Sequence, residues 1–273
     1  MMNSSLTVLM SVYKNTVISE FEDSVLSVIN QTLVPDFIFI GIDGEISENL
    51  HSLIIQYSTK YNFIKLFYFE NNVGLGNVLS VLSKEVSTPF ISRMDTDDIA
   101  LPNRFELMMS YLISNDLDLL GSYILEFTPG VRNKYLKTVP LTQSEIRKYS
   151  KYRNPFNHVT VLMRKTVLDV FNYEDCKFAE DWYLWLRIIE SQKFKLGNMP
   201  IPTVLVNVSN YSRLSGFLRF KIEFNFFHKF YKEGFINLYQ VVFNVIVSFF
   251  TKFVFAKLIK IVYKKILRVK YVE

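Results

Sequence analysis

Over its first hundred residues the chain alternates short apolar runs with helix-length segments. Strands and helices that alternate at this spacing are joined by right-handed crossovers and form a largely parallel sheet. The pattern therefore predicts an α/β fold. The strands that it predicts are Leu6–Tyr13, Phe37–Ile42, Ile64–Phe69 and Pro89–Met94, and the helices between them are Phe21–Gln31, Leu50–Lys60 and Gly76–Glu85.

Three of these four strands end in polar or acidic residues suited to binding. In an open α/β sheet the ligand lies beyond the carboxyl ends of the strands. We therefore expect the functional site at that edge of the sheet. The four strand ends are Ser11–Lys14, Asp43–Gly44, Glu70–Gly74 and Asp95–Asp98.

After Asp98 the alternation is less regular, although further elements can still be assigned. The predicted helices are Pro102–Asn115, Thr166–Phe171 and Phe178–Ser191. The predicted strands are Leu117–Phe127, His158–Arg164, Lys193–Gly197 and Thr203–Val208.

Three carboxylates occupy four consecutive positions in Asp95-Thr96-Asp97-Asp98, directly after a predicted buried strand. Carboxylates this close repel one another unless a positive charge lies between them. A Mg²⁺ or Mn²⁺ ion would neutralise them and could also bind diphosphate oxygens. The alternative is an acidic turn that only caps the following helix, with Asp98 near its N-terminus.

Glu180 and Asp181 form a second acidic pair, followed by the aromatic segment Trp182–Trp185. Adjacent acids at this position could simply cap the N-terminus of a helix. They could also supply a general base that accepts a proton from a sugar hydroxyl as it attacks. The residues alone leave both alternatives open.

Seven short motifs occur in an order that resembles glycosyltransferase family 2, and within it the amylovoran and O-antigen biosynthesis branch. The resemblance covers roughly residues 5–215 and extends more loosely beyond them. Seven motifs in register are far more specific than any one of them. They are Met10–Asn15, Ile29–Thr32, Asn71–Gly76, the aspartate cluster, Leu101–Glu106, Asn154–His158 and Glu180–Asp181.

The resemblance implies a GT-A fold, which is Rossmann-like with a mostly parallel central sheet, and a metal-dependent inverting transfer by single displacement. It implies that Asp97, with Asp95, binds Mn²⁺ or Mg²⁺ and that Asp181 is the catalytic base, supported by Glu180. It also implies a nucleotide-sugar site that includes Asp95. The other members of that site are Ser11, Tyr13, Asp43, Asn72, Gly74, Arg93 and Asp98.

Several residues keep two interpretations. Arg93 and Arg104 could bind diphosphate or could neutralise the negative charge of the aspartate cluster. We favour the second role for Arg104. His158 could contact the acceptor or a phosphate, or it could be a structural histidine. Trp182 and Trp185 could stack on a sugar, but large aromatic residues on a helix more often belong to the core.

Charge divides the chain in two. Residues 1–216 hold 20 basic and 23 acidic residues, a net charge of −3, whereas residues 217–273 hold 11 basic and 3 acidic residues, a net charge of +8. We expect a catalytic domain over 1–216, with a nucleotide-sugar-binding half at 1–98 and an acceptor-binding half at 99–216. Residues 217–273 would then form a basic amphipathic helical tail.

The tail favours association with an anionic membrane surface. Lys257, Lys260, Lys264 and Arg268 recur at helical spacing and would lie on one face. Nucleic acid would also suit a basic aromatic segment, but the hydrophobicity of the tail favours lipid, and we expect no nucleic-acid partner. An ordinary packing helix is a further alternative, and a transmembrane helix at 235–251 stays possible because residues 234–251 carry no charge.

The resemblance therefore implies an enzyme that moves a hexose, galactose or glucose, from a UDP-sugar to an N-acetylhexosamine or oligosaccharide on undecaprenyl diphosphate. A β1,3 link in O-antigen or other surface-polysaccharide biosynthesis is expected. The single cysteine, Cys176, suits a reducing compartment, and we expect a peripheral protein on the cytoplasmic face of the bacterial inner membrane. The alternative is a non-catalytic sugar-nucleotide or membrane-binding module on the same fold.

Overall fold

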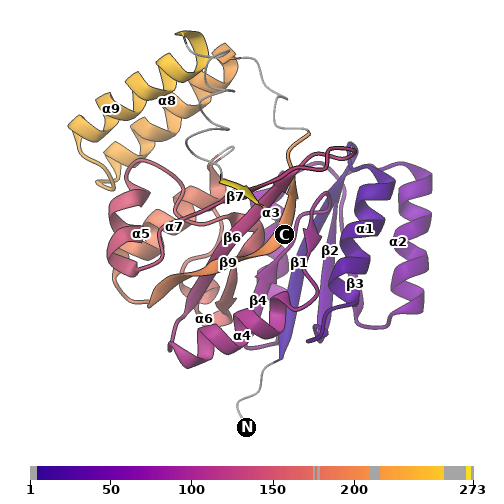
Figure 1. Cartoon of the computed structure of the whole chain (residues 1–273). Coiled ribbons are helices and arrows are strands. Elements are labelled where there is room, and N and C mark those ends of the chain that lie inside the picture. Colours follow the sequence, from indigo (N-terminus) through magenta and orange to yellow (C-terminus); the bar gives the residue numbers. More distant parts are fainter. Residues whose placement is uncertain (1–4, 175, 177–178, 210–215, 255–268, 272–273) are drawn as a thin grey trace.

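Ten strands form one curved sheet in the computed structural model, which describes residues 5–174, 176, 179–209, 216–254 and 269–271 (Figure 1). The strands follow the order β10-β7-β6-β8-β4-β1-β2-β3, and β9 joins both β6 and β5. This arrangement is the mixed α/β, GT-A-like fold that the sequence predicts.

The N-terminal half of the sheet is parallel, as expected. β1 (Leu6–Tyr13) lies between β2 (Phe37–Asp43) and β4 (Phe90–Arg93), and β3 (Ile64–Phe69) extends the sheet beyond β2. All four predicted strands agree with the structure to within one or two residues. Their carboxyl ends therefore meet at one edge.

The remaining strands are mostly antiparallel to their neighbours. β4 pairs with β8 (Leu162–Arg164), and β8 pairs with β6 (Leu119–Phe127). The sheet continues through β7 (Lys134–Lys137) to β10 (Val269–Tyr271). The remaining pairs involve β9 (Leu196–Asn207), which is parallel to β6 and antiparallel to β5 (Ile99–Ala100).

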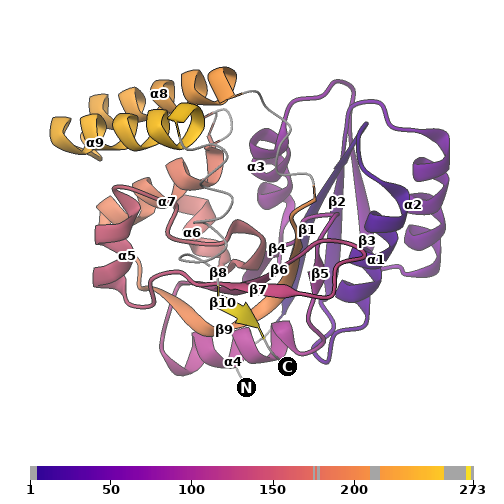
Figure 2. The same ribbon diagram turned by 45° about the horizontal axis from the view of Figure 1, so that its top comes forward.

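Helices cover both faces of the sheet (Figure 2). One core lies between alternate residues of β1 and β2 and three helices, α1 (Ile18–Ile29), α2 (Glu48–Lys60) and α4 (Arg104–Ser114). A second core on the opposite face includes the other helices that precede residue 216. These are α3 (Leu75–Glu85), α5 (Gln143–Ser150), α6 (Lys165–Val170) and α7 (Glu180–Ser191).

Two strand predictions were wrong in detail. The predicted strand His158–Arg164 begins as a 3₁₀ turn over His158–Thr160, and only β8 is extended. The two predicted strands at 193–208 are a single strand, β9, with register shifts opposite Ser122–Ile124 that accommodate Pro200 and Pro202. A bulge of this kind lets proline interrupt the hydrogen-bond ladder without ending the strand.

The segment after residue 216 forms a helical hairpin. α8 (Gly216–Lys232) and α9 (Leu238–Phe249) lie side by side, and a π-helical turn (Phe250–Val254) follows α9. Buried residues of α8 pack on α7 in a third core that includes Tyr183, Leu186, Phe226, Phe227 and Phe230. None of the helices in the described ranges is both long and apolar enough to cross a membrane. The predicted stripe from Lys257 to Arg268 lies outside the described residues.

Candidate functional site

Two adjoining cavities of 480 and 430 Å³ open at the carboxyl ends of β1 and β2. This is the edge of the sheet where the sequence predicts the ligand site, and cavities of this size suit a small organic ligand. Tyr13, Asp43 and Asn72 line both cavities. The smaller cavity extends to the start of α3 and the aspartate cluster, and its wall also includes Ser11, Glu20, Gly74, Leu75, Asp95 and Asp97.

The Asp43 carboxylate organises the loop that follows β3. It accepts hydrogen bonds from the backbone N–H groups of Val73 (2.7 Å) and Gly74 (3.1 Å) and from Asn72 Nδ2 (2.9 Å). Gly74 has a φ of 86°, which favours glycine. A carboxylate offers about four acceptor positions. Asp43 therefore fixes this wall of the cavity and keeps about one position for a ligand.

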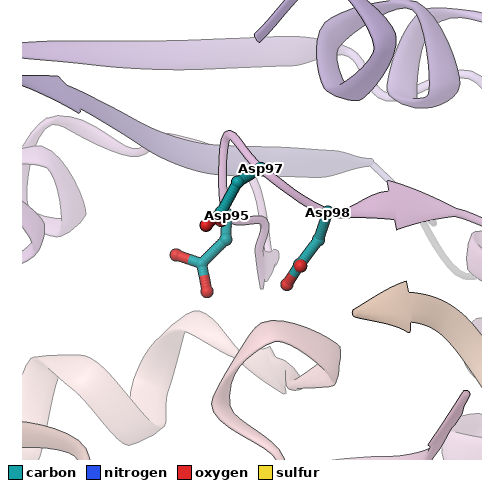
Figure 3. Close-up of side chains that lie close together, drawn as sticks. All are labelled: Asp95, Asp97 and Asp98. Carbon is teal, nitrogen blue, oxygen red and sulfur yellow. The ribbon is translucent and has the colours of Figure 1, made fainter. Parts of the chain in front are cut away.

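The aspartate cluster lies on the loop between β4 and β5 (Figure 3). Asp95, Asp97 and Asp98 each offer one carboxylate oxygen, and these oxygens lie within 4.8 Å of one another. The hydroxyl of Ser24 on α1 donates to the backbone carbonyl of Asp95 at 2.7 Å. Because β4 is buried along its whole length, the position of the first residue of the loop is fixed by the sheet.

Burial and mutual repulsion raise the pKa of two of these carboxyl groups. Burial, followed by the charges of Asp95 and Glu20, raises the pKa of Asp97 to about 6. Burial, followed by Asp95 and Asp97, raises the pKa of Asp98 well above its ordinary value. Asp98 also accepts a hydrogen bond from the backbone N–H of Asn207 at 2.8 Å, which ties the loop to the end of β9.

The donor set fits a hard divalent cation. Carboxylate oxygens suit Mg²⁺ and Mn²⁺, and two oxygens on one Mg²⁺ at about 2.1 Å lie at most about 4.2 Å apart. Small rotations of the three side chains would therefore bring them onto one ion. Asp95 is paired through both oxygens with the guanidinium of Arg93, so it would share its charge between Arg93 and the ion.

Two buried arginines lie beneath the cluster and have different partners. Arg93 pairs with Asp95, and its Nε is buried without a hydrogen-bond partner among the described residues. Arg104 donates to the backbone carbonyls of Arg93 and Val159, both at 2.8 Å. Burial, followed by the charge of Arg93, lowers the pKa of Arg104 to about 9. Arg104 therefore holds the backbone next to the cluster in place through hydrogen bonds, and Arg93 contacts the cluster itself.

Glu180 and Asp181 begin α7 next to the start of α3. A Cβ atom on Gly76 would lie 3.1 Å from Glu180 Cβ, so glycine allows this close approach. Asn154 Nδ2 donates to Asp181 Oδ2 at 2.5 Å, and the backbone N–H of Trp182 donates to Oδ1 at 2.7 Å. These bonds hold the Asp181 carboxylate in a fixed orientation.

The two acids are both harder to ionise than ordinary carboxyl groups. Burial raises the pKa of Asp181 despite its hydrogen bonds. Burial, followed by the charge of Asp181, raises the pKa of Glu180 to about 7, and the charge of Asp95 contributes. Acids with raised pKa values beside a cleft are suited to proton transfer near neutral pH.

His158 and the two tryptophans lie in packed surroundings. His158 Nε2 lies 2.9 Å from the hydroxyl of Tyr173, and the edge of its ring contacts Trp185. Burial, followed by the charge of Arg93, lowers the pKa of His158 well below its ordinary value, so the ring is neutral at pH 7. Trp182 donates to the backbone carbonyl of Ser150 and packs on α8. These contacts favour structural roles.

Three residues of the site have no role in the sequence prediction. Glu20 lines the smaller cavity and accepts a hydrogen bond from Asn207 Nδ2 at 2.9 Å. Asn154 holds Asp181, and Tyr173 holds His158. The motif Asn154–His158 already pointed to Asn154. Nothing in the sequence separates Glu20 from an ordinary acid in the first turn of a helix.

A family model described as Glycosyl transferase family 2 matches residues 7–171. The amylovoran biosynthesis glycosyltransferase AmsE of Erwinia amylovora is 34% identical over 196 residues, which cover 71% of this chain and 73% of AmsE. The UDP-Gal:alpha-D-GlcNAc-diphosphoundecaprenol beta-1,3-galactosyltransferase of Escherichia coli is 30% identical over 270 residues, which cover 96% of each chain.

The fold is also similar to that of solved structures. The crystal structure of S. aureus TarS 1-349 in complex with UDP-GlcNAc superposes with a TM-score of 0.65. The match covers 94% of this chain and 75% of that chain at 13% identity. At this identity the likeness concerns the fold alone.

Proposed function

Because the chain belongs to glycosyltransferase family 2, we propose that it transfers a hexose, galactose or glucose, from a UDP-sugar to an N-acetylhexosamine or oligosaccharide on undecaprenyl diphosphate. The reaction inverts the configuration at the anomeric carbon and forms a β1,3 link in surface-polysaccharide assembly. One observation carries the proposal. A donor set for a divalent cation lies at one cavity, and a second acidic pair lies against Gly76 in α3, whose first residue lines the same cavity.

The cleft supports binding of the nucleotide-sugar. The two cavities join at Tyr13, Asp43 and Asn72 and continue to the aspartate cluster. We assign the base to the end near Lys14 and Ile46, with Ser11 beside the ribose, and the diphosphate to the end near Asp95 and Asp97. Leu75, the first residue of α3, lines the same end, and the first N–H groups of a helix suit an anion such as a diphosphate.

Asp95, Asp97 and Asp98 would hold Mn²⁺ or Mg²⁺. When bound, the cation stabilises the charge that develops on the departing diphosphate. The protein holds the three carboxylates on one short loop and balances Asp95 with Arg93 when the ion is absent. The raised pKa values of Asp97 and Asp98 make cation binding compete with protons.

Asp181 is the proposed general base. The acceptor hydroxyl oxygen attacks the anomeric carbon, the bond from that carbon to the UDP oxygen breaks, and UDP leaves with the electron pair. Asp181 takes the hydroxyl proton, and Asn154 keeps its carboxylate oriented. Glu180 lies next in the chain, and burial followed by the charge of Asp181 raises the pKa of Glu180 itself to about 7.

The relatives and the charge of the chain support a lipid-linked acceptor and a membrane location. The Escherichia coli relative is named for a diphosphoundecaprenol acceptor, and its alignment includes residues beyond 216. The net charge of +8 after residue 216 would attract an anionic membrane surface. We place the enzyme on the cytoplasmic face of the inner membrane as a peripheral protein.

The test is a transfer assay with a panel of UDP-sugars and synthetic N-acetylhexosamine-diphosphate lipids. We expect transfer from UDP-galactose or UDP-glucose that stops with chelator and returns with Mn²⁺ or Mg²⁺. Asp181→Asn should lower transfer roughly a hundredfold or more while UDP-sugar affinity is kept, because the amide cannot accept the proton. UDP-sugar binding without transfer to any acceptor would instead indicate a non-catalytic module.

A further inference from the structure

The exposed face of α9 and the turn after it is apolar along its whole length. From residue 238 to residue 253, every exposed residue is aliphatic or aromatic. Spacings of three and four residues place these side chains on one side of the helix. They are Leu238, Tyr239, Val242, Phe243, Ile246, Val247, Phe249, Phe250 and Phe253, each 42–72% exposed.

Asn244 and Ser248 of the same segment point inward, together with Val241 and Val245, which pack on the third core. Asn244 is 4% exposed and donates to the backbone carbonyl of Lys151 at 2.9 Å. Ser248 is 5% exposed and donates to Glu223 on α8 at 2.7 Å, and Lys252 pairs with the same carboxylate. A helix on the surface of a soluble domain normally exposes polar and charged residues. The exposed side of this segment is apolar instead, which indicates an apolar medium outside α9.

α8 adds an aromatic and basic surface beside this face. Its exposed residues include Phe217, Phe224 and Tyr231, and Lys221 and His228 lie between them at helical spacing. Residues 217–273 hold 11 basic and 3 acidic residues. Aromatic and cationic side chains next to a purely apolar face are the composition of a helix at a lipid headgroup boundary.

We propose that the outward face of α9 inserts into the acyl region of an anionic bilayer, with α8 at the headgroup level. Twelve helical residues span about 18 Å, against about 30 Å for the hydrocarbon core, so α9 would lie in the plane of the membrane. A second copy of the chain is the other possible occupant. The face carries a single polar side-chain atom, the Tyr239 hydroxyl, whereas protein interfaces have a polar rim and hydrogen bonds.

This surface is connected to the proposed base, so the inference deepens the proposed function and rests on it for the identity of the acceptor. Trp182, next to Asp181, packs on Phe226, Phe227 and Phe230 of α8. Lys151 Nζ donates to the backbone carbonyl of Phe235 at 2.6 Å, in the turn of the hairpin. Insertion of α9 would therefore hold Asp181 at a fixed height above the membrane.

The experiment compares Val242→Glu/Ile246→Glu with Ile55→Glu, a control on α2. Val242 and Ile246 are each 49% exposed and Ile55 is 39% exposed, so none of the changes should unfold the chain. Binding is measured with vesicles of phosphatidylglycerol and phosphatidylethanolamine. We expect the double variant to bind about a hundredfold more weakly and the control to bind as the parent does, because each inserted side chain contributes about tenfold.

A second measurement reports depth. Cys176 is the single cysteine, and it is buried, so Cys176→Ala gives a background for one fluorescent label at Ile246→Cys or Ile55→Cys. With the same vesicles, spin-labelled acyl chains should quench the label at position 246 and leave the label at position 55 unchanged. Quenching only by spin-labelled headgroups would overturn insertion.

The remaining outcomes separate this inference from the proposed function. Unchanged vesicle binding by the double variant overturns the inference, and a dimer in solution that the same variant splits would assign the face to a second copy. Transfer to a water-soluble acceptor analogue should be equal in all variants. If vesicle binding depends on Val242 and Ile246 but no variant transfers sugar, the inference stands and the proposed function fails.

Discussion

Asp181 is subject to two opposing influences, and their balance sets the pH at which it can accept a proton. Burial raises its pKa, whereas the hydrogen bonds from Trp182 N–H and Asn154 lower it. The backbone donor cannot be removed by substitution, but Asn154 can. Asn154 belongs to a motif in the sequence, and only the structure shows its hydrogen bond to Asp181.

Asn154→Ala should move the acidic limb of the pH–rate profile to higher pH. A general base works above its pKa and loses activity as the pH falls through it. Removal of the Asn154 donor takes away an interaction with the ionised form, so the pKa rises further. We expect a lower rate at pH 6 and partial recovery at pH 8, measured as kcat/KM. A uniform loss at every pH would show that Asn154 positions the substrate instead.

The raised pKa of Asp97 makes the stability of the folded chain depend on pH. Its pKa of about 6 in the folded chain lies above its ordinary value of 3.8, so the folded state binds this proton more tightly than the unfolded state does. Its ionised form therefore destabilises the metal-free fold above about pH 6, and this cost disappears as the pH falls from 6 towards 4. The sequence alone does not predict this destabilisation, because the raised pKa of Asp97 depends on burial.

Asp97→Asn should stabilise the metal-free chain at pH 8 by about 1 kcal/mol. The advantage in Tm should shrink as the pH is lowered through 6, because Asp97 then takes up its proton. Added Mn²⁺ with UDP should stabilise the parent chain and have little effect on the variant. A variant that is less stable than the parent at pH 8 in chelator would contradict the assignment of a strained, ionised Asp97.

At the scale of elements, the first four strands were predictable because periodicity and function agree there. β1, β2 and β4 are largely buried, and they end at the site edge in residues that the motifs already identified, such as Asp43 and Asp95. The helices between them have apolar faces at regular spacing, as Phe21, Val25 and Val28 do on α1.

The second half was harder to predict because long-range contacts decide its elements. β7 is half-buried, and its sequence shows no alternation of apolar and polar residues. It is a strand only because it pairs with β6 and β10. α5 begins with a capping box, in which the side chains of Thr142 and Glu145 each accept a hydrogen bond from the backbone N–H of the other residue. This pair of residues is a sequence signal for the start of a helix, although the sequence analysis predicts no helix here. The contacts of Glu20 with the site could not be predicted, because β9 brings Asn207 beside it from far along the chain.

A half-buried ion pair links α8 to the turn after α9. Glu223 accepts from Ser248 at 2.7 Å and pairs with Lys252, whose pKa is lowered by burial. Glu223→Ala would leave the half-buried Lys252 without this charge partner, at a cost of about 1–2 kcal/mol. We expect faster hydrogen exchange of the α8 and α9 amides with no change in β1 and β2.

Two variants serve as controls for this prediction. Glu223→Gln with Lys252→Met removes both charges and should restore most of the protection, because no unpaired charge stays buried. Asp116→Ala breaks the exposed pair with Lys195 and should leave exchange unchanged. Equal loss in the single and double variants would show that packing, rather than charge, holds the hairpin.

At the scale of the whole molecule, the C-terminal segment is integrated with the catalytic fold at both of its described ends. α8 packs on α7 beside the proposed base, and β10 adds to the sheet next to β7. A deletion that starts at residue 252 would remove Lys252 and break its pair with Glu223. A truncation after Val254 keeps the whole α8–α9 hairpin but removes β10 and its pairing with β7.

Deletion of residues 255–273 should therefore separate the two sources of membrane affinity. The deletion removes six basic residues and one acidic residue, which leaves 25 of each and lowers the net charge from +5 to 0. Each cation near an anionic bilayer is worth about 1 kcal/mol at moderate salt. The apolar face of α9 stays in place, and its contribution is not screened.

The shortened chain should bind anionic vesicles more weakly than the full chain at low salt and equally well at about 1 M salt, where the Debye length is only about 3 Å. Transfer to a water-soluble acceptor analogue should be kept, since the cleft, the aspartate cluster and Asp181 all lie before residue 255. Co-sedimentation over a salt series measures the difference directly. If the full chain keeps its advantage at high salt, residues 255–273 also contribute apolar contacts, and the membrane surface extends beyond α9.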